Sequence, residues 1–153
     1  MNSKALDHET YMREAIAVAR GNPKAPFGTV LVDRNLDAIV ARGCNQSHTN
    51  PTWHGEIAAI NDYVRQDGKN WGELTLYTTA EPCCMCQGAI LWSGITEVVF
   101  GTSIAELKRQ GWRQIDIPSQ QIVSRSWLPH LGIKAGVLSS ECNELFRRAI
   151  EGR

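Results

Sequence analysis

Two short motifs in this sequence bring together residue types that bind metals and move protons. The first is His54-Gly55-Glu56, and the second is Cys83-Cys84-Met85-Cys86, which directly follows Pro82. Zinc prefers Cys thiolate and His imidazole ligands, and a catalytic zinc keeps three protein ligands and one open position. We therefore predict that His54, Cys83 and Cys86 bind Zn²⁺ as a cofactor.

The predicted helices explain how these three side chains can meet. Cys83 and Cys86 are three residues apart at the start of a predicted helix over residues 83–92, so both sulfurs lie on one face. His54 opens a second predicted helix over residues 54–65. A helix N-terminus lowers the pKa of a thiol, which favours metal ligation. If the two helices lie side by side, their N-termini converge on one ion.

Glu56 is the predicted catalytic residue. It stands two positions after His54 and can point into the same cleft without being a ligand. A carboxylate beside a zinc-activated water can take a proton from that water and deliver it to a ring nitrogen and then to a leaving amine. The motifs therefore indicate zinc-assisted hydrolysis.

Noncatalytic explanations of the motifs are possible alternatives. A structural zinc site normally has four protein ligands, and the candidates for a fourth are Cys84 and Cys44. Cys84 lies between the two ligand cysteines and faces away from them on a helix, while Cys44 stands at a strand end. A zinc-stabilised interaction module would unfold on chelation. The presence of Glu56 favours the catalytic interpretation.

The elements that position these motifs alternate between helix and strand. We predict helices over residues 8–20, 54–65, 83–92 and 139–150, and strands over residues 28–33, 38–43, 74–79, 95–100 and 133–138, with residues 101–129 irregular. The first two strands form an antiparallel hairpin, and strands joined through a helix run parallel. The predicted fold class is α/β, a three-layer α/β/α sandwich with a five-stranded mixed sheet, and residues 1–153 form a single domain.

Composition limits the partners and the location. The 153 residues include 16 Lys plus Arg and 16 Asp plus Glu, so the formal net charge is zero, which disfavours general nucleic-acid binding without excluding a local basic patch. No apolar stretch approaches the roughly 20 residues of a membrane span, and the N-terminal segment lacks the apolar region of a signal peptide. Five cysteines in this spacing do not resemble a disulfide framework. We predict a cytoplasmic protein without a membrane partner.

The two motifs together match the H-x-E…P-C-x-x-C signature of zinc nucleobase deaminases. Over its whole length the sequence resembles the cytidine deaminase-like superfamily, and within it the small guanine deaminases. The segments that carry this second resemblance are Pro26-Phe27-Gly28, Asn50-Pro51-Thr52, Glu81-Pro82-Cys83, Met85-Cys86, Gly88-Ala89-Ile90, Trp92-Ser93-Gly94, Leu131-Gly132-Ile133 and Gly136-Val137-Leu138. The resemblance implies the same zinc ligands and the same role for Glu56.

The resemblance also implies substrate contacts and an oligomeric state. Asn45 would hydrogen-bond the base, and Phe27 would stack on it or pack near it. Trp92 ends the zinc-binding helix and Trp112 lies in the irregular stretch, where substrate loops tend to be, so both are candidate pocket walls. Large aromatic residues are, however, core residues more often than ligand contacts. The family resemblance implies a homodimer in which one chain lines the cleft of the other.

One stretch departs from the guanine deaminases. In the segment 111–116, Arg113 and Gln114 stand where those enzymes carry acidic residues that contact the donor edge of the purine, and only Asp116 remains as a nearby acid. We therefore predict a deaminase of a free nucleobase or a related small aminated N-heterocycle that releases ammonia. Guanine, cytosine, a pterin and a triazine all stay open as substrates.

Two other groups of deaminases with the same zinc chemistry are alternatives to the guanine deaminases. Cytosine deaminases share the His-Gly-Glu motif. The tRNA-specific adenosine deaminases share the cysteine motif and the pattern over residues 136–142, and a tRNA partner could rest only on the cluster of Arg147, Arg148 and Arg153. Because the tRNA enzymes are typically basic, the neutral charge of this chain favours a small-molecule substrate.

Overall fold

The computed structural model describes residues 5–153, so the first four residues of the N-terminal segment discussed above lie outside it. In chain order the elements are α1 (His8–Ala19), β1 (Gly28–Asp33), β2 (Ala38–Cys44), α2 (Gly55–Arg65), a 3-10 turn η1 (Trp71–Glu73), β3 (Leu74–Ala80), α3 (Cys84–Ser93), β4 (Glu97–Thr102), α4 (Ile104–Gln110), α5 (Ser119–Ser124), β5 (Gly132–Lys134) and α6 (Ser139–Glu151). Within residues 5–153, no helix has the length and apolar character needed to cross a membrane.

The five strands form one mixed sheet in the order β2-β1-β3-β4-β5. Strand β1 is antiparallel to both of its neighbours, whereas β3, β4 and β5 are parallel to one another. This arrangement confirms the predicted sheet and hairpin. Because β2 and β3 both run opposite to β1, the carboxyl ends of β2, β3 and β4 reach the same edge of the sheet.

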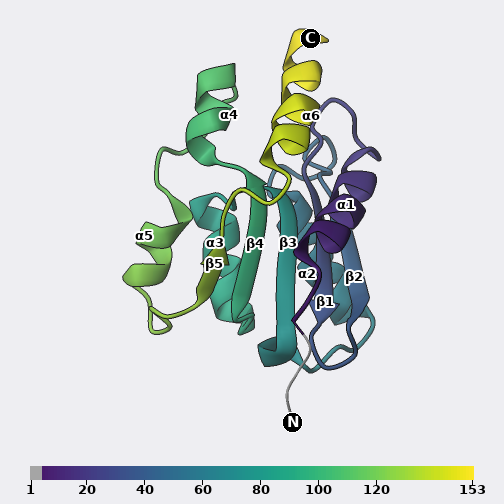
Figure 1. Cartoon of the computed structure of the whole chain (residues 1–153), viewed down its shortest axis with the longest axis vertical. Coiled ribbons are helices and arrows are strands. Elements are labelled where there is room, and N and C mark those ends of the chain that lie inside the picture. Colours follow the sequence, from purple (N-terminus) through teal and green to yellow (C-terminus); the bar gives the residue numbers. More distant parts are fainter. Residues whose placement is uncertain (1–4) are drawn as a thin grey trace.

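Helices cover both faces of the sheet, which confirms the three-layer sandwich (Figure 1). Helices α2, α3 and α5 lie on one face, and α1 and α6 lie on the other. Side chains alternate along β1 as a strand buried on both sides requires. Val30 and Val32 join the core beneath α1 and α6, while Leu31 joins the core beneath α2.

A third apolar cluster extends the core beyond the carboxyl edge of the sheet. It contains Ala80, Leu107, Trp112, Phe146 and Ala149, with the half-buried Phe27 and Ile150 packed against it. In Figure 1, α4 and α6 rise above the strands in this region. The cluster therefore connects the loops above the sheet to its core.

The stretch 101–129 is more regular than predicted. It contains α4 and α5, and β4 continues into it as far as Thr102. Ser103 caps α4 by accepting a hydrogen bond from the backbone N–H of Glu106, and Gly111 ends the helix with a φ of 103°. These are ordinary helix-end signals, but α4 has only 7 residues and is too short for periodicity to reveal it.

The last strand is shorter than the predicted strand over residues 133–138. Strand β5 ends at Lys134 because the chain then turns through Gly136 and Leu138, whose φ values are 76° and 52°. The N–H of Val137 still donates to the carbonyl of Phe100 at 3.2 Å. One tertiary hydrogen bond therefore persists where the regular ladder has stopped.

Candidate active site

The metal-binding motifs meet because two helices start at the same edge of the sheet. Helix α2 follows β2, helix α3 follows β3, and both strands run in the same direction. His54 and Cys83 are the N-cap residues of these helices, and both have extended backbones. Neither side chain makes a capping hydrogen bond, so both are available to point into the space between the helices.

Two glycines allow α2 to lie directly on the sheet. A Cβ at Gly55 would come within 2.6 Å of the Phe27 carbonyl oxygen, and one at Gly43 would come within 2.1 Å of the Ala59 nitrogen. Both distances are far below normal contact. The glycine of the His54-Gly55-Glu56 motif is therefore needed to seat the start of α2, which carries both functional side chains.

The three predicted ligands have the spacing of a zinc site. The Sγ atoms of Cys83 and Cys86 lie 3.6 and 3.5 Å from His54 Nδ1, and the three ligand atoms lie within 4.8 Å of one another. Zn–N and Zn–S bonds of about 2.0 and 2.3 Å at a tetrahedral angle place nitrogen and sulfur about 3.5 Å apart. Among the described residues no fourth Cys, His, Asp or Glu joins this group. The set thus fits zinc with one position left for a non-protein ligand.

Hydrogen bonds within the set determine which sulfur carries negative charge. Hydrogen bonds from Cys86 and His54 lower the pKa of Cys83 to about 4. The reciprocal bond to Cys83 and burial raise the pKa of Cys86 well above its usual range, and the bond to Cys83 raises the pKa of His54. Cys83 is therefore the more acidic of the two cysteines. A metal bound by this set displaces the remaining protons of its ligands.

Glu56 lies beside the ligands and is not one of them. Its side chain is buried, and it lines the same cavity as His54 and Cys83. Burial is the main reason that the pKa of Glu56 is raised to about 7, and the neighbouring Cys83 thiolate adds to the rise. The carboxyl group can therefore exchange a proton near neutral pH, which suits an acid–base residue.

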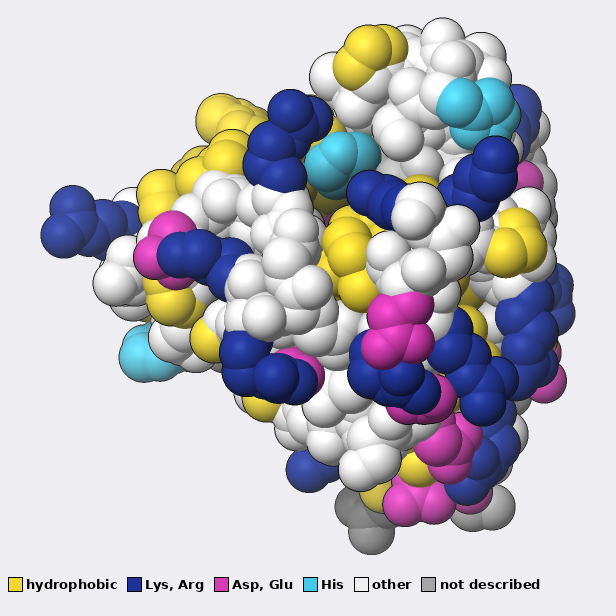
Figure 2. Space-filling model, turned by 90° about the horizontal axis from the view of Figure 1, so that it is seen from above, with side chains coloured by type: hydrophobic (Ala, Val, Ile, Leu, Met, Phe, Trp, Pro, Cys, Tyr) yellow, Lys and Arg dark blue, Asp and Glu magenta, His cyan; other side chains and the backbone are white. Residues whose placement is uncertain are grey.

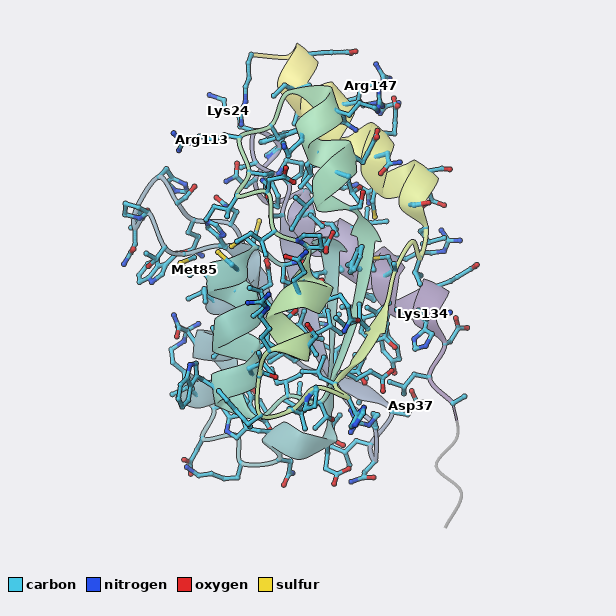
Figure 3. All side chains as sticks on the ribbon, turned by 90° about the vertical axis from the view of Figure 1, so that its left-hand side faces the viewer. Lys24, Asp37, Met85, Arg113, Lys134 and Arg147 are labelled. Carbon is cyan, nitrogen blue, oxygen red and sulfur yellow. The ribbon has the colours of Figure 1, made fainter. Side chains whose placement is uncertain are left out.

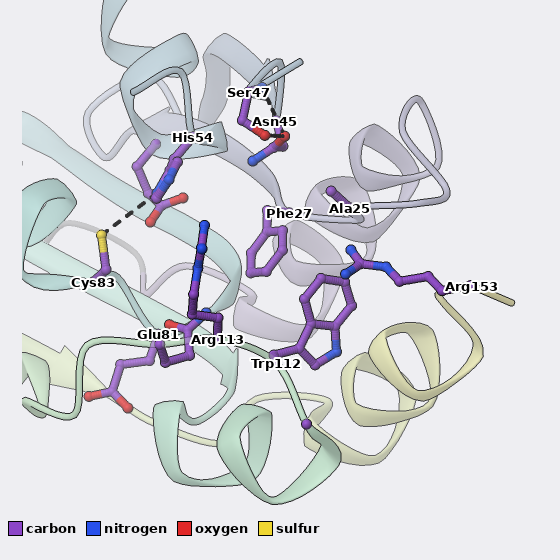
Figure 4. A pocket seen from close by; sticks show the side chains of 13 residues that line it. Ala25, Phe27, Asn45, Ser47, His54, Glu81, Cys83, Trp112, Arg113 and Arg153 are labelled. Atoms are coloured by element: carbon purple, nitrogen blue, oxygen red, sulfur yellow. Dashed lines mark hydrogen bonds between the residues drawn. The ribbon is translucent and has the colours of Figure 1, made fainter. Parts of the chain in front are cut away.

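The cavity above the ligands has a volume of about 420 Å³ (Figure 4). Its walls come from four places in the chain: the segment before β1, the loop after β2, the loop after α4, and the C-terminal residue Arg153. A cavity of this size falls within the range of small-molecule sites. The metal ligands therefore lie at the base of a pocket large enough for a heterocycle.

Asn45 lines this pocket with its amide held in one orientation. Its Oδ1 accepts hydrogen bonds from the backbone N–H of Ser47 at 3.0 Å and from the Ser47 hydroxyl at 2.8 Å. Its own backbone N–H donates to the carbonyl of Phe27. Within residues 5–153 its Nδ2 group has no hydrogen-bond partner, so it presents a donor to the pocket.

Phe27 and Trp112 form an aromatic wall of the same pocket. Phe27 contacts Trp112 edge-to-face, with ring centroids 5.5 Å apart, and also contacts Phe146. The indole N–H of Trp112 donates to the Phe146 carbonyl at 3.3 Å, and the Arg153 guanidinium lies 4.3 Å from the Trp112 ring centroid. The wall is therefore anchored to α6.

Residues 6–102 match a family model described as the cytidine and deoxycytidylate deaminase zinc-binding region. The chain belongs to this deaminase family. It is thus a zinc-dependent enzyme of the cytidine deaminase superfamily that hydrolyses C–N bonds, and the predicted resemblance is confirmed.

Relatives of the deaminase carry three different names at similar identity. A probable cytosine deaminase of Schizosaccharomyces pombe is 37% identical over 84% of this chain and 82% of its own. A guanine deaminase of Bacillus subtilis is 32% identical over 76% and 81%, and a tRNA-specific adenosine deaminase of Buchnera aphidicola is 35% identical over 88% and 83%. These identities do not separate the possible substrates.

A solved structure confirms the fold. The guanine deaminase of Nitrosomonas europaea superposes with a TM-score of 0.78 at 22% identity, covering 95% of this chain and 85% of that one. At this identity the likeness concerns the fold alone. The predicted cytidine deaminase-like architecture is therefore confirmed.

Two of the predicted substrate contacts lie outside the pocket of the deaminase. Trp92 lies eight residues along α3, so the helix carries it about 12 Å from the metal end. There it is 80% exposed and contacts Trp127 in a tilted arrangement, with ring centroids 4.6 Å apart. Asp116 is exposed and pairs with Lys108 at 2.7 Å. Neither residue lines the pocket of the chain, whereas Phe27, Asn45 and Trp112 do.

Glu81 has a role in the site that sequence reasoning missed. This buried carboxylate accepts hydrogen bonds from the backbone N–H of Ile104 at 2.9 Å and from the backbone N–H and hydroxyl of Ser119, each at 2.8 Å. It therefore ties the starts of α4 and α5 to the segment that leads into Cys83. The position of Glu81 two residues before Cys83 is a sequence signal that it belongs to the site. Its structural role could not be predicted, because Ile104 and Ser119, to which it bonds, are distant in sequence.

Proposed function

We propose that this deaminase hydrolyses the exocyclic amine of a free nucleobase or a related small aminated N-heterocycle and releases ammonia. The observation that carries the proposal is the buried Glu56 carboxylate in a 420 Å³ cavity beside three convergent zinc ligands. A cavity of this volume suits one ring system rather than an extended polymer segment.

Each residue at the base of the pocket has a distinct role in the proposed reaction. His54, Cys83 and Cys86 hold the zinc ion. When bound, zinc activates a water molecule as a nucleophile at neutral pH. Glu56 takes one proton from the attacking water and passes it to the ring nitrogen next to the amine-bearing carbon. It then takes a second proton from the hydroxyl added to that carbon and passes it to the departing amine, which leaves a ring carbonyl and ammonia.

The upper walls orient the ring in the same proposal. Asn45 offers its Nδ2 donor to a ring carbonyl or an unprotonated ring nitrogen. Phe27 and Trp112 provide an apolar surface against which the flat ring packs. The amine-bearing carbon is thereby directed toward the zinc end of the pocket.

The zero net charge and the paired arginines of α6 favour a small substrate over tRNA. The formal net charge is zero, and α6 holds its arginines in ion pairs: Arg147 with Glu144 and Glu151, and Arg148 with Glu144. Of the arginine cluster on which a tRNA partner could rest, only Arg153 reaches the pocket. A homodimer and a cytoplasmic location, both inferred from the sequence, stay predictions.

Ammonia release tests the proposal directly. The zinc-loaded protein is assayed against amino-substituted purines, pyrimidines, pterins and triazines, with Glu56→Gln as the inactive control. Release from at least one free heterocycle, absent in Glu56→Gln, is expected. A protein with one zinc per chain that deaminates none of them would overturn the proposal.

The tRNA alternative is tested with the same preparation. A tRNA anticodon stem-loop replaces the free heterocycle, and inosine formation is measured at increasing salt. Deamination of this RNA with a steep salt dependence, without activity on free heterocycles, would establish the alternative instead.

A further inference from the structure

The loop between α4 and α5 holds its residues in fixed positions at the pocket mouth. At its start, the N–H of Gly111 donates to the Lys108 carbonyl at 3.0 Å and the N–H of Trp112 donates to the Leu107 carbonyl at 2.9 Å. Gly111 has a φ of 103°, which glycine adopts without strain. This hydrogen-bonded helix end sets the direction in which the loop leaves α4.

The loop is fixed at further points beyond its start. The Trp112 side chain is buried and bonded to α6, Asp116 pairs with Lys108, and Ser119 is bound by Glu81. The backbone of Arg113, which directly follows Trp112, is therefore held in place on the rim.

Arg113 is a cation of the pocket without an internal partner. It lines the cavity and is exposed, and within residues 5–153 it forms no ion pair or hydrogen bond. In Figure 4 its side chain extends from the loop over the pocket, in view between Cys83 and Phe27, and in Figure 3 it projects outward from the molecule. Of the two carboxylates that line the pocket, Glu81 is already bound by three donors and Glu56 forms no ion pair with Arg113.

Other cations lie near Arg113. Arg153 lies over the Trp112 ring, and its guanidinium donates to the Lys24 carbonyl at 3.0 Å, so Arg153 and Lys24 are neighbours. Lys24 and Arg113 project from the same side of the molecule in Figure 3, opposite to Lys134. From above, Lys and Arg side chains stand around a recess floored by hydrophobic side chains (Figure 2).

The charge at the mouth contrasts with that of the neighbouring helices. Arg109 of α4 pairs with Glu106, and Arg147 of α6 pairs with Glu144 and Glu151. Positive charge is thus neutralised along these helices and left uncompensated at Arg113. A cation at the mouth of a pocket complements an anionic group on whatever enters it.

We propose that the heterocycle deaminated here carries a carboxylate on the edge away from its amine, and that Arg113 binds this group. The inference rests on the proposed function, since the amine must face the zinc end for the anion to reach the mouth. A guanidinium matches a carboxylate or phosphate with two parallel hydrogen bonds, and Arg153 supplies a second positive charge nearby. Arg113 is thereby a specificity-determining residue.

Matched substrate pairs test the proposal. Pterin is compared with pterin-6-carboxylate, and cytosine with cytosine-5-carboxylate, by kcat/KM for ammonia release. We expect the anionic member of at least one pair to be preferred. Arg113→Gln lowers the anionic-to-neutral ratio about 10- to 100-fold, as expected for loss of a charge-assisted pair, and Arg113→Lys lowers it less.

Lys134→Gln is the matched control, because it removes the same charge from the opposite side of the molecule. We expect this variant to keep the wild-type ratio. A ratio that falls equally in Arg113→Gln and Lys134→Gln would reflect net charge alone and would overturn the proposal. Equal kcat/KM within every pair, with free heterocycles still deaminated, would also overturn it and would leave the proposed function intact.

Binding provides a readout that does not depend on turnover. The affinities of zinc-loaded Glu56→Gln for pterin and pterin-6-carboxylate are measured by pterin fluorescence, with and without Arg113→Gln. The anion site is supported if Glu56→Gln binds pterin-6-carboxylate more tightly than pterin and if Arg113→Gln removes this preference. This result would support the site even if the wild-type protein released no ammonia, because the absence of ammonia would overturn the proposed function only. If both proteins bind pterin and pterin-6-carboxylate equally, and Arg113→Gln weakens binding of a tRNA stem-loop instead, Arg113 would be an RNA contact.

Discussion

The two ends of the pocket are built in different ways. At the metal end, His54, Glu56, Cys83 and Cys86 come from two motifs of three and four residues, each placed at a helix start that follows a strand. At the open end, the walls come from the segment before β1, the loop after β2, the loop after α4 and the C-terminal residue. The chemistry therefore depends on local sequence, and the selectivity depends on tertiary structure.

This difference explains which parts of the site could be predicted from sequence. The spacing of Cys83 and Cys86 fixes their relative placement through helix geometry alone. Strands β2 and β3, which run in the same direction on either side of β1, bring His54 to them. The sheet and its layers follow from strong alternation of helical and β-rich segments. The pattern of apolar residues predicts helices and strands of this length well.

The remaining parts depend on contacts between distant residues. Trp112 belongs to the pocket because its indole bonds to α6, and Trp92 does not because α3 carries it away from the metal. Nothing in the local sequence distinguishes these two tryptophans. Helix α5 has 6 residues and begins where Ser119 meets Glu81, so its start is set by a partner 38 residues away.

Removal of a ligand at the metal end is expected to have the largest effect. Cys86→Ser replaces a buried sulfur ligand, so we expect less than a tenth of the wild-type zinc content, activity lowered at least 1,000-fold, and a lower melting temperature. Zinc is measured by elemental analysis and unfolding by circular dichroism. Cys84→Ser is the matched control and should retain zinc and activity; if it lost zinc as well, Cys84 would be a ligand.

Glu56→Gln should separate chemistry from metal binding. The amide is nearly the same size but cannot act as the acid–base group, so kcat should fall about 100- to 10,000-fold. One zinc per chain and an unchanged melting temperature are expected alongside, because Glu56 is not in the ligand set. Loss of zinc in this variant would instead make the carboxylate a ligand.

Glu81→Gln tests the connection between the two ends. Glu81 Oε1 accepts from Ile104 and Oε2 accepts from Ser119, and an amide can satisfy only one of these helix starts. We expect a loss of about 1–3 kcal/mol in the free energy of unfolding, measured in urea, and a rise of about 10-fold in KM with a smaller change in kcat. If Glu81→Gln instead lowered kcat about 10-fold and left KM unchanged, Glu81 would act in the chemical step.

Trp92→Ala should have the smallest effect. Trp92 is exposed and outside the pocket, so activity should stay within about 3-fold and the unfolding free energy within about 0.5 kcal/mol. Trp112→Ala serves as the contrast, since it removes a buried side chain and should cost about 3–5 kcal/mol. A 10-fold loss of activity in Trp92→Ala would show that this residue reaches a substrate or a second chain.

The N-caps of α2 and α3 link metal binding to local unfolding. His54 and Cys83 occupy positions where a Ser or Asp side chain would ordinarily bind the first amides of a helix, and neither does so. We therefore predict that a zinc ion shared by the two sites holds the first turns of both helices. Amide hydrogen exchange in these turns, at two places 29 residues apart in the chain, should slow together as zinc is added.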